Sequence, residues 1–430
     1  MNIRARRFPD ALLLILLSVL CALTQSFVQA DLSDDDWPMF RHNLAGTGAT
    51  TSSASIKPEK LWSYTEELYT SSAHSSSAVV VNGVVYAGSF RYLNKSSGSV
   101  CAFDAFTGAK IWNYSTDTYV HSAPAVSGKT LFIGVGSDVY AFDALTGAKT
   151  GSFETGNLAS APVTADGIVY FGSLAGNLYA INASTRLKEW NYATDEGIVS
   201  SAAVSEGLVY FGSLDTNVYA LDALTGTKIW NYTTGGPVES SPAVCDGVVY
   251  IVSRDFRLAV GDESLYALNA STGNQLWKYT FNPSLHHGDS ASAAVAHGIV
   301  YVGSADGYVY AINASTGKKL WGYDTGARVT GSPALAEGVV YVGSRLGAVY
   351  ALDALTGIVM WVFNTDNAII SSPAVSKGVL YIGSKDGVFY AIGEREQNNQ
   401  VIIPMLLVII PFSALMVFVL IKRRSQHKVK

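Results

Sequence analysis

The feature that most constrains this chain of 430 residues is a phrase that recurs eight times in its middle part. An aromatic residue inside a β-branched run marks each copy, and successive copies are 38 to 51 residues apart. The eight aromatic residues are Tyr86, Phe132, Tyr170, Tyr210, Tyr250, Tyr301, Tyr341 and Tyr381. A period in this range is typical of arrays in which each repeat is one supersecondary unit that buries its apolar faces against its neighbours.

Each copy reads as four short strands rich in β-branched and aromatic residues, separated by turn residues. Asp-Gly pairs such as Asp306–Gly307 predict the turn between the second and third strands, and Thr-Gly pairs predict the next turn. In Val349–Leu352 both alternating sides of the third strand are apolar, so this strand must be buried on both faces. A radial stack of sheets provides such burial. The sequence therefore predicts an all-β fold, an eight-bladed β-propeller of four-stranded blades over residues 61–392.

A tryptophan ends the fourth strand of most copies, and its positions predict how the ring closes. These tryptophans are Trp112, Trp190, Trp230, Trp277, Trp321 and Trp361. Trp62 lies in a fourth-strand sequence that no blade precedes, whereas the last copy has no fourth strand. We therefore expect residues 61–64 to close blade eight, which removes an exposed sheet edge. Blade two is the weak copy, because Gly151 stands where tryptophan is expected.

Both ends of the chain carry targeting signals. Arginines followed by an apolar run predict a secretory signal peptide over residues 1–30. Residues 401–421 contain no charge and are long enough to cross a bilayer, so we expect one C-terminal transmembrane helix. The basic tail 422–430 then lies in the cytoplasm, and the propeller is extracellular on a single-pass protein of the cell membrane. An N-terminal extension at 31–60 and a linker at 393–400 complete the predicted division.

Charge limits the partners of the predicted exterior. The formal net charge of the chain is -5, and the predicted tail and signal peptide contribute five and two positive charges. Residues 31–400 therefore carry -12. An acidic exterior without a basic cluster argues against nucleic acid as a partner. The expected partners are the membrane, through the single span, and other envelope or surface proteins.

The pattern Ala-x-Asp-Ala-x-Thr-Gly-x-x-x-Trp, found at 220–230 and 351–361, carries a family resemblance. It resembles the PQQ-like repeat (pyrroloquinoline-quinone-type, tryptophan-docking) of quinoprotein dehydrogenases and of the propeller lipoprotein of outer-membrane assembly. The opening Asp36–Arg41 is similar to the start of many such proteins. The resemblance covers residues 36 to about 392 and implies the propeller fold. It does not decide the activity, because catalysts and scaffolds share this architecture.

An active quinoprotein dehydrogenase would, by that resemblance, need a vicinal cysteine pair, Glu, Asn and Asp ligands for Ca²⁺, and a catalytic Asp. The mature chain has only Cys101 in blade one and Cys245 in blade five, on opposite sides of the ring. A disulfide needs Cα atoms within about 7 Å, so these two cannot pair. We therefore expect no enzyme activity, and no catalytic, cofactor-binding or metal-binding residues. The expected function is a non-enzymatic protein-interaction or cell-envelope scaffold; a quinone- and calcium-dependent dehydrogenase and a surface receptor for a carbohydrate or small ligand are the alternatives.

Departures from the repeat indicate where a ligand or partner would bind, because insertions in repeat proteins map to loops on one face. Insertions occur at 90–95 in blade one, at 254–263 in blade five and at 281–289 between blades five and six. The candidate ligand or partner residues are His286, His287, Asp289, Arg254, Asp255, Asp262, Glu263, His74 and His121. Their spacing matches no defined metal motif, so solvated loops and a structural role for the histidines remain the alternative reading.

Six sequons are potential N-glycosylation sites in an extracellular protein. They begin at Asn94, Asn113, Asn182, Asn231, Asn269 and Asn313. Asn182, Asn269 and Asn313 occupy the turn position that aspartate fills in other blades, where either side chain can cap the turn. Turn chemistry alone is therefore a sufficient explanation for these three.

Overall fold

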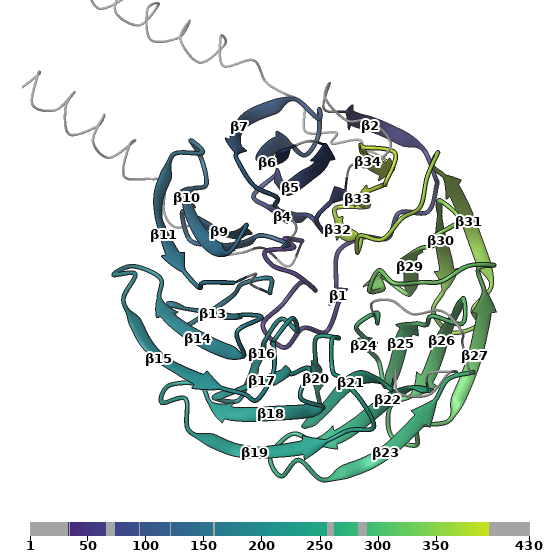
Figure 1. Cartoon of the computed structure of the whole chain (residues 1–430). Helices are drawn as coiled ribbons and strands as arrows, with labels where there is room; N and C mark the ends of the chain where they lie inside the picture. Colours follow the sequence, from purple (N-terminus) through teal and green to yellow (C-terminus); the bar gives the residue numbers. More distant parts are fainter. Residues whose placement is uncertain are drawn as a thin grey trace, which may run out of the picture. The chain divides into compact units, whose positions relative to one another are not determined.

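The computed structural model describes residues 33, 35–65, 74–93, 95–120, 122–157, 160–255, 262–282 and 290–394. Within these residues eight β-sheets follow one another around a ring in the order of the sequence (Figure 1). Each sheet has four antiparallel strands, and the sheets of blades one and seven each carry one further short strand. The predicted eight-bladed β-propeller of four-stranded blades is confirmed.

The first and second strands form the inner half of each blade. The first strands are β4 Val79–Val81, β8 Ala125–Ser127, β12 Val163–Ala165, β16 Ala203–Ser205, β20 Ala243–Cys245, β24 Ala294–Ala296, β28 Ala334–Ala336 and β32 Ala374–Ser376. The second strands are β5 Val84–Leu93, β9 Thr130–Val135, β13 Ile168–Gly172, β17 Leu208–Gly212, β21 Val248–Asp255, β25 Ile299–Gly303, β29 Val339–Gly343 and β33 Val379–Gly383. The first strands of adjacent blades lie beside one another around the centre.

The third and fourth strands form the outer half. The third strands are β6 Lys95–Asp104, β10 Asp138–Asp143, β14 Asn177–Asn182, β18 Asn217–Asp222, β22 Asp262–Asn269, β26 Tyr308–Asn313, β30 Ala348–Asp353 and β34 Val388–Gly393. The fourth strands are β7 Lys110–Thr116, β11 Lys149–Glu154, β15 Lys188–Ala193, β19 Lys228–Thr233, β23 Gln275–Thr280, β27 Lys319–Asp324, β31 Val359–Asn364 and β2 Lys60–Thr65. Two short strands, β1 Ala49–Thr50 and β3 His74–Ser75, pair with β28 and β5.

Strand β2 closes the ring as the sequence predicts. It pairs antiparallel with β34, and Trp62 lies opposite Ala391. The Trp62 Nε1 donates a hydrogen bond of 3.0 Å to the carbonyl oxygen of Ala105 in blade one. One strand from the start of the chain therefore completes blade eight and also fastens it to blade one.

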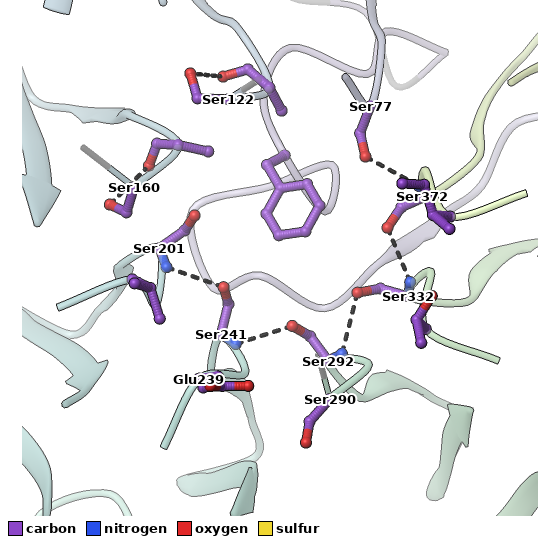
Figure 2. A pocket seen from close by; sticks show the side chains of 16 residues that line it. Ser77, Ser122, Ser160, Ser201, Glu239, Ser241, Ser290, Ser292, Ser332 and Ser372 are labelled. Carbon is purple, nitrogen blue, oxygen red and sulfur yellow. Dashed lines mark hydrogen bonds between the residues drawn. The ribbon is translucent and has the colours of Figure 1, made fainter. Parts of the chain in front are cut away.

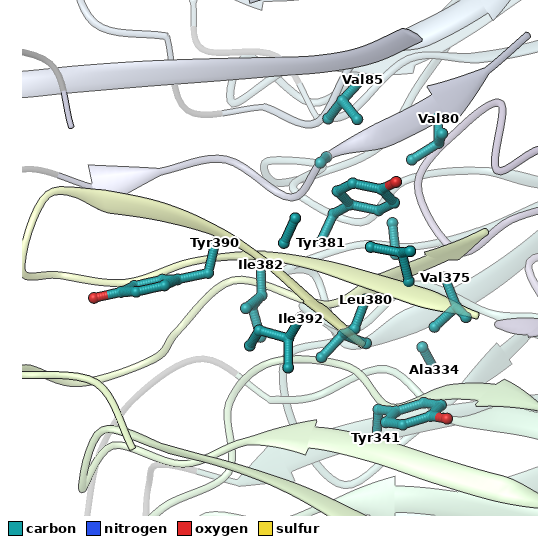
Figure 3. Close-up of a cluster of buried hydrophobic side chains, with 14 of the residues drawn as sticks. Val80, Val85, Ala334, Tyr341, Val375, Leu380, Tyr381, Ile382, Tyr390 and Ile392 are labelled. Carbon is teal, nitrogen blue, oxygen red and sulfur yellow. The ribbon is translucent and has the colours of Figure 1, made fainter. Parts of the chain in front are cut away.

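The hydrophobic core lies between adjacent blades rather than within one sheet. Figure 3 shows one such cluster, in which Leu380 and Ile382 of blade eight face blade seven with Tyr341, while Tyr381 faces Val80 of blade one. Every fourth-strand tryptophan donates its Nε1 hydrogen bond to a carbonyl of the next blade or of the N-terminal segment, at 2.8 to 3.1 Å. The third strands are buried on both faces, as expected. Apolar contact between blades thus stabilises the ring as a whole.

Two insertions that the sequence predicts as loops are paired β-strands in the structure, so these two predictions are wrong. In blade one, β5 and β6 continue as a paired hairpin to Leu93 and Lys95. In blade five, β21 and β22 remain paired as far as Asp255 and Asp262. Both insertions lengthen the hairpin because the antiparallel backbone hydrogen bonds simply continue, which leaves fewer unpaired polar groups than a loop would.

Among the residues described, no helix is long and apolar enough to cross a bilayer. The predicted signal peptide at 1–30 and the predicted span at 401–421 lie outside the described residues.

Candidate functional site

The segment from Trp37 to Ser53 lies inside the ring of first strands (Figure 1). Trp37 exchanges two backbone hydrogen bonds with Val80 of blade one, at 2.6 and 2.8 Å. Further along, carbonyl oxygens of the segment accept hydrogen bonds from first strands of five more blades. These pairs are Val126 with Pro38, Val204 with Leu44, Val244 with Ala45, Val295 with Thr47 and Leu335 with Gly48. The Ser53 carbonyl accepts a further hydrogen bond from the Gly378 N–H of blade eight. The N-terminal extension is therefore an integral part of the propeller that joins seven blades from the inside.

Arg41 is buried within this segment, with 3% of its surface exposed. Its Nη1 donates hydrogen bonds of 3.0 and 2.9 Å to the carbonyl oxygens of Ser241 and Pro242. Within the described structure its Nε and Nη2 have no partner. Burial lowers the pKa of Arg41 to about 9, because removing water disfavours the charged form. The segment thus places a guanidinium next to the two residues that precede the first strand of blade five, β20.

A serine just before the first strand fastens that strand to the second strand of the same blade. In each of six blades, the serine Oγ accepts a hydrogen bond from the backbone N–H twelve residues later, at 2.7 to 3.2 Å. These serines are Ser76, Ser122, Ser160, Ser200, Ser240 and Ser371. These serine hydroxyls replace a backbone acceptor at positions where the proline or alanine before the first strand does not pair within the sheet. The regular first strand is therefore three residues long, shorter than the expected Ser-Pro-Ala-Val piece.

The next residue in most blades is also serine, and these side chains form what we call the serine belt. The belt consists of Ser77, Ser201, Ser241, Ser292, Ser332 and Ser372. The N–H of Ser201 donates to the Oγ of Ser241, and the same bond repeats from blade to blade until Ser372 donates to Ser77 (Figure 2). These five bonds measure 2.8 to 3.1 Å. Blades two and three carry Ala123 and Ala161 instead, so the belt is open on that side.

The belt lines a cavity of about 310 Å³ on the axis of the ring. Phe40 of the N-terminal segment contributes one aromatic side chain to the lining, and Glu239 is the one carboxylate among the described lining residues. On the side where the belt is open, Ala123, Ala161 and Val199 line the cavity together with Ser122 and Ser160, whose hydroxyls donate to the carbonyl oxygens of Ala123 and Ala161. The five belt hydroxyls that accept a backbone N–H each retain an O–H group. The belt side of the cavity therefore offers more hydroxyl donors than the open side.

Of the predicted ligand or partner residues, some lie outside the described part of the chain and others lie in paired strands. His286, His287, Asp289 and His121 lie outside the described residues. His74 is in β3, opposite Phe90 in the strand register. Asp255 and Asp262 are paired at the end of the blade-five hairpin. In the described part of the chain no three His, Cys, Asp or Glu side chains gather as a metal site would require. The prediction that these residues share a binding face stays a prediction.

Arg254 and Glu263 of the same hairpin are buried, with 1% and 3% of their surfaces exposed. They lie opposite each other in the register of β21 and β22. The Glu263 Oε2 accepts hydrogen bonds from the Ser304 hydroxyl at 2.8 Å and from the Ala305 N–H at 3.0 Å, both in blade six. Burial raises the pKa of Glu263 above its ordinary value, and these hydrogen bonds oppose the rise. The pair therefore connects blades five and six instead of facing solvent.

The sequons divide as the turn chemistry predicts. In three of them, the Oδ1 atom of the asparagine accepts hydrogen bonds of 2.9 to 3.2 Å from the backbone N–H groups two and three positions later. The three residues are Asn182, Asn269 and Asn313. The capping role of these three residues is confirmed. Asn113 and Asn231 are exposed on the outer strands β7 and β19. Asn94 lies outside the described residues.

Cys101 and Cys245, the cysteines within the described residues, form no disulfide bond with each other. Cys101 is buried in β6, and Cys245 ends β20 on the other side of the ring. Burial raises the pKa of the Cys245 thiol to about 11, so this thiol is protonated at neutral pH.

The family model described as outer membrane protein assembly factor BamB matches residues 44–196, 135–239, 194–330 and 305–399. The chain belongs to this family. The BamB structure from Moraxella catarrhalis is 20% identical, with a TM-score of 0.63 over 78% of this chain and 100% of that chain. A europium-containing methanol dehydrogenase is 14% identical, with a TM-score of 0.70 over 85% of this chain and 99% of that chain. The computationally designed Ika8 protein is 15% identical, with a TM-score of 0.63, covering 80% and 100%.

These likenesses to solved structures show the fold alone, since scaffold, enzyme and design share it. No curated protein sequence matches the chain. The BamB family membership and the PQQ-like repeat are thus established, and the activity has to be argued from the site.

The quinone of the dehydrogenase relatives does not fit this cavity. Pyrroloquinoline quinone is a tricarboxylate, and binding it requires cationic partners. The described lining contains hydroxyls and the Glu239 carboxylate but no lysine or arginine. The lining also contains no Asn or Asp with which to complete the Ca²⁺ ligand set that the family resemblance implies. The donor set therefore disagrees with an anionic quinone and its calcium ion.

Proposed function

We propose that this protein is a membrane-anchored extracellular propeller that acts as a non-enzymatic interaction scaffold for other envelope or surface proteins. The observation that carries the proposal is a set of apolar side chains on the outer strands, at the position just before the docking tryptophan. They are Ile111, Ile229, Leu276, Leu320 and Met360, with 45 to 51% of their surfaces exposed. Exposed apolar side chains that recur on one surface mark protein interaction sites.

The outer strands also offer backbone groups to a partner. Each fourth strand ends its sheet, so one of its edges pairs with no further strand of that sheet. An extended segment of another protein can add to such an edge through main-chain hydrogen bonds, while side-chain contacts give specificity. A partner strand next to β19, for example, would cover Ile229 at the same time.

Family membership supports envelope partners. The matching family is described as an assembly factor of the outer membrane, and we extend to this chain only the coarser idea of a propeller that binds envelope proteins. The anchor rests on the predicted signal peptide and the predicted span at 401–421.

Site-directed photo-crosslinking in native membranes tests the scaffold. A photoreactive residue at 229 or 276 is expected to capture the same envelope proteins, and the Ile229→Asp and Leu276→Asp variants are expected to lose them on affinity purification. Thr227, exposed on the turn before β19, provides the matched control position. Deleting residues 284–289 asks whether the predicted loop face is the interface instead. If partners vanish with that deletion and survive both aspartate substitutions, the outer strands are not the interface.

A dye-reduction assay with the quinone and Ca²⁺ tests the non-enzymatic part of the proposal. We expect no turnover above that of the free quinone and no thermal stabilisation. Stabilisation accompanied by turnover would replace the scaffold with a dehydrogenase.

A second candidate function is the binding of a small hydroxylated ligand in the axial cavity. The belt hydroxyls favour it, because Ser241, Ser292 and Ser332 line the cavity and each has an O–H group to donate. Phe40 supplies an aromatic face of the kind on which sugar rings stack. Saturation-transfer NMR against a panel of sugars and polyols tests this candidate, with Phe40→Ala as the variant that should abolish transfer.

A further inference from the structure

The two kinds of tight turn lie at the same end of blades one to seven, and we call this surface of the propeller the turn face. The N–H of the residue that opens the turn between third and fourth strands donates to a carbonyl in the turn between first and second strands. Examples are Ala105 with Gly83, Ala223 with Gly207 and Ala354 with Gly338, at 2.8 to 2.9 Å. The turn face therefore carries both the Gly turns of the inner hairpins and the Thr-Gly turns of the outer hairpins.

The described chain also ends on the turn face. Strand β34 runs toward it, and the Gly393 N–H donates a 2.8 Å hydrogen bond to the Glu59 carbonyl just before β2. Glu394 forms an ion pair with Lys57. A Cβ on Gly393 would meet the carbonyl oxygen of Gly378, which belongs to the inner turn of blade eight. The last described residues are thus fixed beside blade eight at this face.

One position of the Thr-Gly turn projects a large apolar side chain into solvent. It is the residue just before Thr-Gly, and 60 to 81% of its surface is exposed in four blades. These residues are Phe106, Leu145, Leu224 and Leu355. At the same position, blades three, five and six carry the exposed residues Ser184, Ser271 and Ser315.

Blade eight has no turn of its own, and the N-terminal segment supplies the missing position. The Ser55 carbonyl accepts the Trp361 Nε1 hydrogen bond at 2.9 Å, just as the Ala105 carbonyl accepts that of Trp62. Ile56 therefore stands where Phe106 stands in blade one, and 58% of its surface is exposed. Leu355, Ile56, Phe106 and Leu145 thus occupy equivalent tips of four consecutive blades, seven, eight, one and two. We call them the apolar arc.

The apolar arc surrounds the point where the chain leaves the propeller. Blade eight, from which the chain leaves, lies inside the arc. Across the ring the row is interrupted, because blades three, five and six carry serine tips and Leu224 of blade four stands alone between them. Exposed lysines begin the fourth strands of six blades on the turn face, and three of them, Lys60, Lys110 and Lys149, belong to blades of the arc. Exposed carboxylates lie at the opposite ends of fourth strands, at Asp117, Glu154 and Asp366. The inner turns of the turn face also carry exposed carboxylates, Asp166, Glu206, Asp246 and Glu337, of which only Glu337 belongs to a blade of the arc. A lipid surface with anionic headgroups favours apolar tips flanked by lysines and disfavours the carboxylate end.

We propose that the apolar arc rests in the interface of the lipid bilayer that holds the protein, so that the propeller lies tilted on its membrane with the turn face down. The inference rests on the proposed membrane anchor. Six residues, 395–400, separate Glu394 from the predicted span, and a fully extended chain rises about 3.5 Å per residue. The arc's blade eight is therefore held within about 25 Å of the bilayer.

Fluorophores that respond to lipid test this arrangement on the full chain. Single cysteines are placed at Leu145 and Leu355, or at the matched turn positions Ser271 and Ser315, in a Cys245→Ser background, since Cys101 is buried. Each variant carries an environment-sensitive label and is reconstituted into vesicles of three parts phosphatidylcholine to one part phosphatidylglycerol. We expect a blue shift and quenching by doxyl-labelled lipids at 145 and 355, at least threefold stronger than at 271 and 315.

The remaining outcomes separate this inference from the proposed anchor. Flotation of the full chain with vesicles after carbonate washing reports the anchor alone, and its failure overturns the proposed function together with this inference. Flotation with equal or absent quenching at all four positions overturns the lipid contact only. Label protection that depends on protein concentration, without lipid quenching, assigns the arc to a second copy of the chain and also refutes the proposal. The Phe106→Asp and Leu145→Asp pair should abolish quenching at 355 while flotation persists.

Discussion

Most blades contact the next through a fourth-strand tryptophan that packs on the glycine of a Thr-Gly turn, and between blades two and three the large and the small residue of this contact are exchanged. The exchange leads to a testable prediction. At six interfaces a tryptophan ring covers the glycine of a Thr-Gly turn; a Cβ on Gly147, for instance, would lie 2.5 Å from the Trp112 ring. At the interface of blades two and three, Gly151 replaces the tryptophan and Arg186 replaces the glycine. The Arg186 Nη1 donates to the Thr150 carbonyl, and a Cβ on Gly151 would lie 2.7 Å from that nitrogen. The guanidinium thus fills the space that an indole fills elsewhere.

Restoring only one partner is expected to be unfavourable or neutral. Gly151→Trp forces an indole into the space of the guanidinium, and such overpacking costs about 1–3 kcal/mol. Arg186→Gly relieves a positive φ of 62°, worth about 1 kcal/mol, but it loses a hydrogen bond of about 1 kcal/mol. The single Arg186 variant should therefore stay within about 1 kcal/mol of the parent.

Restoring both partners is expected to stabilise the protein. A docked indole buries about 150–250 Å², which at about 25 cal/mol per Å² is an upper bound of about 4–6 kcal/mol. Side-chain entropy and the lost arginine contacts reduce the net gain to about 2 kcal/mol. The new Nε1 can donate to the Ala183 carbonyl, the counterpart of the Ala144 carbonyl that Trp112 uses. The coupling free energy between the two substitutions should then be about 3–5 kcal/mol.

Urea unfolding followed by far-ultraviolet circular dichroism measures the four free energies, because an added tryptophan would alter fluorescence. The control transfers the natural exchange to the neighbouring interface: Trp112→Gly with Gly147→Arg should cost less than Trp112→Gly alone. If the effects of Gly151→Trp and Arg186→Gly simply add, the two side chains do not share one space and the reasoning is refuted.

Three further predictions concern closure, the belt and pH. Trp62→Ala should lower the free energy of unfolding by about 3–5 kcal/mol, measured by urea titration; a loss below 1 kcal/mol would mean that β2 does not close the ring. Ser332→Ala leaves the buried Ser292 N–H unpaired and should lower the free energy of unfolding by about 1–3 kcal/mol. Ser201→Ala is the control and should cost less, because the Ser201 Oγ accepts no belt hydrogen bond in the described structure. Equal melting temperatures of the two variants would contradict this. Because the pKa of Glu263 is raised on folding, the folded state binds more protons, so stability should fall as pH rises above the ordinary value of 4.5. Glu263→Gln should flatten melting temperature against pH in that window, and an unchanged slope would assign it to other groups.

Much of the fold was predictable because its signals are local and repeat. The β-branched strands, the Thr-Gly turns and the aspartate or asparagine caps each depend on residues within about ten positions, and eight copies average out the departures of any one blade. Closure by Trp62 was predictable for the same reason, since its local sequence is that of a fourth strand.

The site was less predictable because its partners are far apart in the chain. The belt hydrogen bonds join residues about 40 positions apart, and the Arg41 contact with Ser241 spans 200. The repeat spacing of the belt serines was visible as a signal, but the donors to their hydroxyl oxygens are backbone groups of the preceding blade. Arg254 and Glu263 illustrate the opposite error, because charged residues in an insertion suggest solvent, whereas a lengthened hairpin buries both.

The sequence by itself determined the number of blades, their strands and turns, the closing strand and the weak copy at Gly151. Only the tertiary structure decided that residues 37–53 run inside the ring, that Arg186 fills the place of the absent tryptophan, and that Ile56 completes a row of exposed tips. The physical reason is that strands and turns are chosen by residues within reach along the chain. Contacts between blades depend instead on the geometry of the closed ring, which brings Ser55 to Trp361 across 306 positions.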